Sequence, residues 1–182
     1  MKYMIASDIH GSAYYCRLLL DEYKKSGASR LILLGDILYH GPRNDLPRDY
    51  EPKQVISMLN GIKDQIYCVR GNCDTEVDQM VLEFPVLADY GLVLVDGLTI
   101  YITHGHIYHK DHLPPIQKGD ILLHGHTHIL TAEREGDITI LNPGSVSIPK
   151  AGNPPTYGVL EDQVFSILDF EGNKIIEMNL GE

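Results

Sequence analysis

The segment Lys2-Tyr3-Met4-Ile5-Ala6-Ser7-Asp8-Ile9-His10 decides the fold of this chain. Its first six residues form a short, mostly apolar run that predicts a buried strand, and Asp8 stands where that strand ends. The same arrangement returns in Leu31-Ile32-Leu33-Leu34-Gly35-Asp36, and again from Gln65 to Asn72. Polar residues at the carboxyl ends of neighbouring strands stand where open α/β sheets place their ligands.

Helical patterns separate these three predicted strands. The first runs from Ser12, a suitable N-cap, to Ser26, and Gly27 follows its end. A second pattern covers Lys53 to Leu59, with Pro52 near its start. Such strand–helix alternation predicts right-handed crossovers and a parallel sheet.

The second half of the chain has the pattern of short strands joined by tight turns. Asp96-Gly97 between two apolar runs is a strong hairpin signal. Further strands are predicted at 121–123, 129–134, 138–141, 157–160, 164–170 and 174–178. We therefore expect one α/β domain over residues 1–182, an αββα sandwich of two mixed β-sheets flanked by helices. The long loop from Tyr39 to Glu51 should overhang a composite site at the strand ends.

Charge and composition narrow the class of partner. The chain carries a net charge of −10, which argues against a general binder of nucleic acid or acidic membranes and against long nucleic acid as a substrate. An acidic shell around a cationic centre suits a small anionic substrate. No apolar segment is long enough to span a membrane or to act as a signal peptide. Three cysteines without framework spacing favour a reducing cytoplasm.

Five short segments carry most of the chemistry. Carboxylate, imidazole and amide groups are ligands for divalent cations, and two such cations can clamp a phosphoryl group and ionise a bound water. Asp8 and His10 lie two residues apart, and in extended geometry both would point to one face and chelate one ion. The segments are Asp8-Ile9-His10, Gly35-Asp36, Gly71-Asn72-Cys73-Asp74, His104-Gly105-His106 and Gly125-His126-Thr127-His128.

The order D-x-H, GD, GNxD, HGH, GHxH resembles the calcineurin-like metallophosphoesterase superfamily. That resemblance implies two divalent metal ions that share Asp36, and a hydroxide held between them that attacks the phosphoester. One ion would be bound by Asp8, His10, Asp36 and His128, and the other by Asp36, Asn72, His104 and His126. His124 and His106 fall outside this ligand set.

The segment at 71–74, together with those at 40–44 and 142–145, resembles the small YfcE-like phosphodiesterases of bacteria. This likeness covers essentially the whole chain. The resemblance implies a hydrolase that acts on small phosphodiesters, with manganese as the preferred metal. Oxygen and nitrogen ligands also admit zinc, iron, nickel or cobalt. The physiological diester and the oligomeric state, including a homo-oligomer, stay open at this point.

Asn72, Cys73, Asp74 and Arg43 are the candidates for direct roles in catalysis. The wider superfamily has histidine where this chain has Cys73, and that histidine is thought to protonate the leaving oxygen. A thiol is a poor substitute, so we expect modest turnover and a preference for activated leaving groups. Asp74 would orient neighbouring groups or cap the next helix, Arg43 would bind phosphate, and Ser145 would bond a ligand histidine.

Two other functions compete with this interpretation. A phosphomonoesterase, including a protein phosphatase, would use the same metal ligands, so only substrate selectivity separates it from a diesterase. A scaffold with a degenerate site is the non-enzymatic alternative, because the same small fold occurs as a subunit of retromer. A degenerate site should have lost ligands, and here only the histidine replaced by Cys73 is missing.

Overall fold

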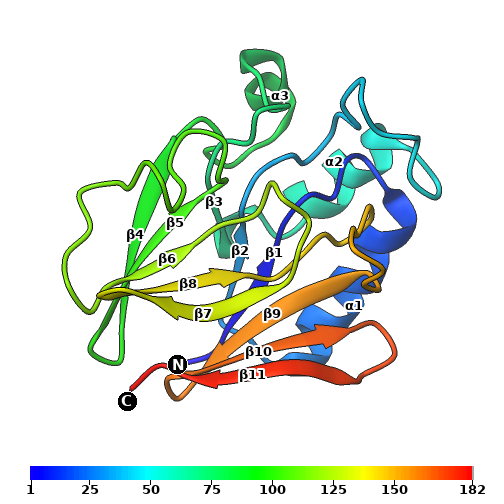
Figure 1. Cartoon of the computed structure of the whole chain (residues 1–182). Helices are drawn as coiled ribbons and strands as arrows, with labels where there is room; N and C mark the ends of the chain where they lie inside the picture. Colours follow the sequence, from blue (N-terminus) through cyan, green and yellow to red (C-terminus); the bar gives the residue numbers. More distant parts are fainter. Residues whose placement is uncertain (182) are drawn as a thin grey trace.

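The computed structural model describes residues 1–181 and contains two β-sheets packed face to face (Figure 1). The first sheet contains β1 (Tyr3–Ala6), β2 (Arg30–Leu33), β3 (Ile66–Cys68), β9 (Thr156–Glu161), β10 (Val164–Asp169) and β11 (Lys174–Asn179). The second contains β4 (Tyr90–Val95), β5 (Leu98–Thr103), β6 (Ile121–Leu123), β7 (Thr131–Glu135) and β8 (Ile138–Asn142). The strand orders are β11-β10-β9-β1-β2-β3 and β4-β5-β6-β8-β7. Both sheets mix parallel and antiparallel pairs, as the sequence predicts.

The helices α1 (Ala13–Ser26) and α2 (Pro52–Asn60) pack on the first sheet, and a 3₁₀-helix (Lys63–Gln65) leads into β3. Ser12 caps α1 because its side chain accepts a hydrogen bond from the Tyr15 N–H. Gly27 ends the helix in the left-handed region, at φ 67°. The predicted parallel arrangement of β1, β2 and β3 is confirmed.

The first sheet is buried on both faces. Met4 and Ala6 of β1 pack against the helices, whereas Ile5 packs against the second sheet. Leu31 and Ile32 of β2 divide in the same way. A strand covered on both sides needs apolar residues at every position, which explains why these strands read as continuous apolar runs.

The second sheet is built from tight connections and loops. Asp96 and Gly97 have φ values of 50° and 83°, which the predicted hairpin turn between β4 and β5 requires. Among the described residues after Val81 there is no helix, so the helical layer covers the first sheet alone. The remaining helix, α3 (Glu76–Val81), projects from the body and buries none of its side chains (Figure 1).

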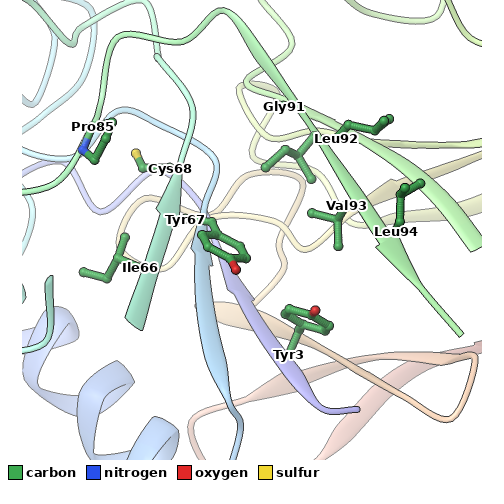
Figure 2. A pocket seen from close by; sticks show the side chains of 10 residues that line it. Tyr3, Ile66, Tyr67, Cys68, Pro85, Gly91, Leu92, Val93 and Leu94 are labelled. Atoms are coloured by element: carbon green, nitrogen blue, oxygen red, sulfur yellow. The ribbon is translucent and has the colours of Figure 1, made fainter. Parts of the chain in front are cut away.

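The end strands β3 and β4 border an apolar groove on one side of the molecule (Figure 2). It has a volume of about 530 Å³ and is lined by Tyr3, Ile66, Tyr67, Cys68, Pro85, Gly91, Leu92, Val93, Leu94 and Ile102. The lining contains no histidine and no carboxylate, so the candidate metal ligands predicted from the sequence lie elsewhere.

Within residues 1–181, none of the helices combines the length and the apolar character that a bilayer crossing requires.

Candidate metal centre

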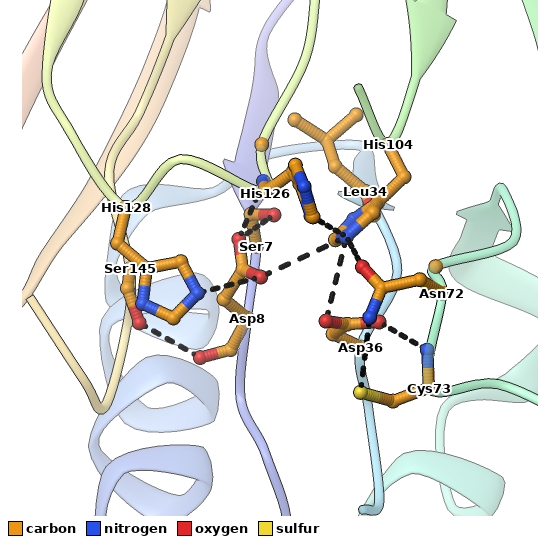
Figure 3. A network of polar contacts seen from close by, with 12 residues as sticks. Ser7, Asp8, Leu34, Asp36, Asn72, Cys73, His104, His126, His128 and Ser145 are labelled. Carbon is orange, nitrogen blue, oxygen red and sulfur yellow. Dashed lines mark hydrogen bonds and ion pairs between the residues drawn. The ribbon is translucent and has the colours of Figure 1, made fainter. Parts of the chain in front are cut away.

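The candidate ligands gather at the seam between the two sheets (Figure 3). The first sheet supplies Asp8 after β1, Asp36 after β2 and Asn72 after β3. The second sheet supplies His104 directly after β5, and His126 and His128 after β6. His10 completes the set. All seven sequence-predicted ligands therefore lie in one region, contributed by loops of both sheets.

The backbone around Asp8 differs from the expected extended geometry. Asp8 and His10 have φ values of 59° and 49°, so the prediction of an extended dipeptide is wrong. The chain turns because it continues to pair with the loop after β2, where the Asp8 N–H donates to the Gly35 carbonyl and the His10 N–H to the Asp36 carbonyl. The side chains still meet, and His10 Nε2 lies 3.6 Å from Asp8 Oδ1.

Positive φ is a shared property of the candidate ligands. Non-glycine residues rarely adopt this region, and each instance costs of order 1–3 kcal/mol, which the surrounding structure must offset. Five of the seven have it: Asp8 at 59°, His10 at 49°, Asp36 at 54°, His126 at 65° and His128 at 60°. Such a concentration of strained residues is typical of a functional site.

Three of the four histidines are oriented in the same way. In each, Nδ1 lies within hydrogen-bond distance of a backbone carbonyl oxygen, which can only accept, so Nδ1 carries a proton and Nε2 faces the site. The pairs are His10 with Tyr39 at 2.7 Å, His104 with Leu34 at 2.6 Å, and His128 with Ile148. This arrangement is the one that metal-binding imidazoles use.

The first cluster of ligand atoms consists of Asp8, His10 and His128, whose atoms all lie within 4.8 Å of one another. Asp8 Oδ1 is 3.1 Å from His128 Nε2. The same oxygen is fully buried and accepts no hydrogen bond from the described residues. A buried carboxylate oxygen without a donor is costly, and a cation would compensate it.

The second cluster consists of Asp36, His104 and His126, again with ligand atoms within 4.8 Å. Asn72 belongs here as well, because its Oδ1 lies 3.1 Å from His104 Nε2. Asp36 Oδ2 is 3.4 Å from His104 Nε2 and 3.7 Å from His10 Nε2, so it stands between the two clusters. The arrangement fits two divalent cations that share one carboxylate.

The charges of the two clusters depend on one another. Burial lowers the pKa of His104, but Asp36 and Asp8 outweigh it and raise that pKa to about 9. Burial and the neighbouring His104 lower the pKa of His126 to about 4. Burial also disfavours the ionised forms of Asp8 and Asp36, yet the surrounding histidines hold both pKa values below the usual range. The carboxylates therefore stay ionised and present negative charge to a cation.

Asp74 holds the backbone beneath Asp36. Its buried carboxylate accepts hydrogen bonds from the N–H groups of Asp36 at 2.8 Å, Ile37 at 2.9 Å and Gly71 at 2.7 Å. Burial raises its pKa to about 6 despite these donors. The alternative expectation that Asp74 caps the next helix is wrong, because Thr75 is the N-cap of α3 and forms a capping box with Asp78.

Cys73 lies at the mouth of the centre. Its backbone N–H donates to Asp36 Oδ1 at 2.8 Å, and its thiol receives a 3.4 Å contact from Asn72 Nδ2. Burial and the adjacent Asp36 raise the pKa of this thiol to about 12. Cys73 is therefore protonated at neutral pH and is a poor covalent nucleophile.

Ser145 does not bond a ligand histidine, so that expectation is wrong. Its hydroxyl donates to the Asp8 carbonyl at 2.9 Å and accepts from the Ile148 N–H. Ser147, which the sequence analysis missed, adds bonds to the carbonyls of Asp8 and Ile9. The loop after β8 thus fixes the strained Asp8 backbone through its serine hydroxyls, and the His128 ring through the Ile148 carbonyl.

A cavity of about 390 Å³ opens above the two clusters. Its lining residues are His10, Asp36, Gly41, Pro42, Arg43, Asn44, Asn72, Cys73, His126, Thr127, His128 and Lys150. The structure thus places Arg43 at the centre, as the loop position predicts. The second half of that loop is held against α1, where the Ala13 N–H donates to the Asp49 carbonyl. Lys150 was not predicted, because nothing in its sequence neighbourhood marks it as close to the ligands.

Comparison with known proteins places this geometry in a family. Residues 1–163 match the model of the calcineurin-like phosphoesterase superfamily domain. The chain is 47% identical to the phosphodiesterase YfcE of Escherichia coli K12 over 176 residues, which cover 97% of this chain and 96% of that protein.

Solved structures agree with the sequence match. The structure of the E. coli phosphoesterase Yfce superposes with a TM-score of 0.97 at 45% identity, over the full length of both chains. Zinc-complexed Vps29 from Entamoeba histolytica gives a TM-score of 0.68 at 19% identity, also over the full length of both chains, which is a likeness of fold alone. This chain belongs to the calcineurin-like phosphoesterase superfamily.

Proposed function

We propose that this protein is a metal-dependent phosphodiesterase that hydrolyses small phosphodiesters with two divalent cations. Asp8, His10, Asp36 and His128 would hold one cation, and Asp36, Asn72, His104 and His126 the other. The observation that carries the proposal is Asp36 Oδ2, which lies between imidazoles of both clusters, at 3.4 Å and 3.7 Å. The 47% identity to the E. coli phosphodiesterase supports the choice of reaction.

Bound divalent cations supply an activated water at neutral pH and offset the charge that develops on the phosphoryl oxygens. The chain's own residues position the candidate metal ligands and the substrate. Asp74 fixes the backbone of Asp36 through three N–H bonds, and backbone carbonyls fix three imidazole rings. Arg43 lines the wall of the cavity, and its guanidinium suits a phosphate group of the substrate.

Protonation of the leaving oxygen is the weak step of this centre. Cys73 stands where the resemblance to the wider superfamily implies a histidine, and its thiol, with a pKa raised to about 12, gives up a proton reluctantly. Loss of a general acid typically costs about 10²- to 10⁴-fold. We therefore expect the fastest reaction with esters whose leaving groups are stable anions, such as aryl oxides.

Manganese is the metal that we expect to work best, while zinc, iron, nickel and cobalt also suit oxygen and imidazole ligands. Long nucleic acid is not the expected substrate, since the net charge is −10. The three cysteines are free, which suits the expected cytoplasmic location. We propose that residues 1–182 form one catalytic domain.

The first experiment compares two aryl esters after chelation and addition of manganese. We expect hydrolysis of bis-p-nitrophenyl phosphate to exceed that of p-nitrophenyl phosphate, and Asn72→Ala to lower kcat by about 10²-fold or more. Asn60→Ala is the matched control, because Asn60 bonds the Glu83 N–H and the Val81 carbonyl away from the cavity. It should reduce thermal stability without reducing kcat.

A preference for the monoester would assign the site to a phosphomonoesterase instead. If neither ester were hydrolysed with any metal of the series, the non-enzymatic scaffold would become the better supported function.

A further inference from the structure

Within residues 1–181, fewer than half of the fifteen lysine and arginine side chains are neutralised by an ion pair with a neighbour. Six lysines form ion pairs with carboxylates, namely Lys2, Lys25, Lys63, Lys110, Lys118 and Lys174. Arg43 and Lys150 have no such partner within residues 1–181, although acidic residues outnumber basic ones by 25 to 15. Both line the cavity above the candidate metal centre. Two free cations in one cavity of an acidic protein indicate an anionic occupant.

Lys150 and Arg43 lie in different loops, and each loop is held by its own hydrogen bonds. The Lys150 N–H donates to the His128 carbonyl at 3.2 Å, which ties Lys150 to the loop that carries a candidate ligand from the second sheet. Arg43 lies in a turn closed by the bond from Asn44 Nδ2 to the His40 carbonyl at 2.8 Å. The adjacent Gly41 packs so closely that an added Cβ would lie 3.3 Å from Cys73 Sγ. The cavity thus has one cation on the His128 wall and one on the Cys73 wall.

A simple phosphodiester does not account for both cations. It carries one negative charge, and a metal pair held by Asp8 and Asp36 already has more positive charge than its two carboxylates neutralise. Arg43 and Lys150 add two further charges. A cavity of about 390 Å³ also has room beyond the group that is cleaved.

We infer that Arg43 and Lys150 form a subsite for a second phosphate, so that the preferred substrate is a phosphodiester that carries a further phosphate group. The inference rests on the proposed function, because it assigns the scissile diester to the metal centre. Arg43 offers a fork of donors and Lys150 a mobile ammonium group, and both bind phosphate oxygens.

The test uses a matched pair of substrates, thymidine 5′-(p-nitrophenyl phosphate) and the same ester with a 3′-phosphate. We expect the wild-type protein to favour the phosphorylated ester by about tenfold in kcat/KM, mainly through KM, because a hydrogen-bonded charge contributes roughly that much. Lys150→Gln should reduce this preference about fivefold, and Lys150→Arg should retain it. The double variant R43Q/K150Q should abolish it.

Lys24→Gln is the matched control. Lys24 also has no ion pair among the described residues, but it lies in the last turn of α1, 11 residues from the start of that helix and therefore about 16 Å along its axis. The preference should be unchanged in this variant. An equal preference in the wild type, K150Q and K24Q would overturn the inference.

A binding measurement separates this inference from the proposed reaction. Titration calorimetry with manganese-loaded protein would compare thymidine 3′,5′-bisphosphate with thymidine 5′-phosphate. Tighter binding of the bisphosphate that is lost in K150Q supports the subsite even if bis-p-nitrophenyl phosphate is not hydrolysed, in which case the proposed function alone fails. A bisphosphate advantage that survives in R43Q/K150Q contradicts the subsite.

Discussion

Five of the seven candidate metal ligands have unusual backbone conformations. Asp8, His10, Asp36, His126 and His128 all have positive φ, which asparagine and glycine tolerate better than histidine. Hydrogen bonds hold these residues in place, such as that from the Ser145 hydroxyl to the Asp8 carbonyl. Without metal, the centre should therefore be less stable than its surroundings.

His126→Asn tests this at one residue. His126 has φ 65° and lies half-buried beside His104, so asparagine should relieve backbone strain. In chelated protein we expect the free energy of unfolding to rise by about 1 kcal/mol, while manganese binding weakens. Urea denaturation in EDTA measures the first effect, and calorimetry the second.

His106→Asn is the matched control for that substitution. The His106 ring lies edge-on to the His104 ring, as His126 does, but His106 does not have positive φ. His106→Asn should leave the free energy of unfolding unchanged. A similar rise in both variants would contradict the role of strain.

At the scale of elements, local signals predicted the fold well. Ser12 and Gly27 marked both ends of α1, and Asp96-Gly97 marked the hairpin between β4 and β5. A helix after Asp74 was expected, but the range of α3 was not predicted, because α3 buries no side chain and so has no apolar periodicity, although the Thr75–Asp78 capping box was readable. The order β11-β10-β9-β1 depends on contacts between distant segments, which no local pattern encodes.

The same distinction applies to the candidate site. The seven candidate ligands could be named from the order of the five motif segments, and Asp8 and Asp36 each follow an apolar strand, which marked the edge of the sheet where they lie. Lys150 and Ser147 could not, because they reach the centre from a loop whose path is set by bonds to His128 and Asp8.

The turn between β10 and β11 allows a test of one element. The Asp169 carboxylate accepts bonds from the N–H groups of Glu171 at 2.9 Å and Asn173 at 2.8 Å, and from Asn173 Nδ2 at 2.8 Å. Desolvation opposes the ionised form, but these bonds outweigh it and lower the pKa of Asp169. A carboxyl group whose pKa is lower in the folded state stabilises the protein above its unfolded pKa. That contribution is lost as pH falls through the folded pKa.

Asp169→Asn should therefore lower the free energy of unfolding by about 1 kcal/mol at pH 7. The difference from wild type should shrink below about pH 3.9, where the unfolded carboxyl group begins to protonate. Urea denaturation of both proteins between pH 7 and pH 3 measures this difference in the free energy of unfolding. Asp162→Asn, in the neighbouring turn at φ 49°, should have little effect at any pH. A difference for D169N that persists unchanged at pH 3 would rule out the charged acceptor as its cause.

For the whole molecule, the candidate centre joins the two halves of the sandwich. Asp8, Asp36 and Asn72 follow strands of the first sheet, whereas His104 and His126 follow strands of the second. Cations bound by both groups would cross-link the sheets only in the folded state. Metal binding should therefore contribute directly to global stability.

Manganese at about 100 times its dissociation constant should stabilise the protein by about 2.7 kcal/mol. For a chain of this length that corresponds to a rise in Tm of roughly 5–10 °C. Differential scanning calorimetry with EDTA and then with manganese measures the shift. Asn60→Ala should keep the shift and Asp36→Asn should lose most of it. An unchanged Tm after chelation would contradict a cross-linking role.

The positive φ angles also bear on how such a protein would evolve. A lineage that no longer needed metal would be free to accept glycine at Asp8, His10, Asp36, His126 and His128, and each such replacement would relieve backbone strain. Mutation alone would thus erode the centre, with selection for stability acting in the same direction. This chain has all five side chains, which is the pattern that continued selection for metal binding would leave, and Asn72 and His104, which lack positive φ, would be the slowest to change once that selection ended.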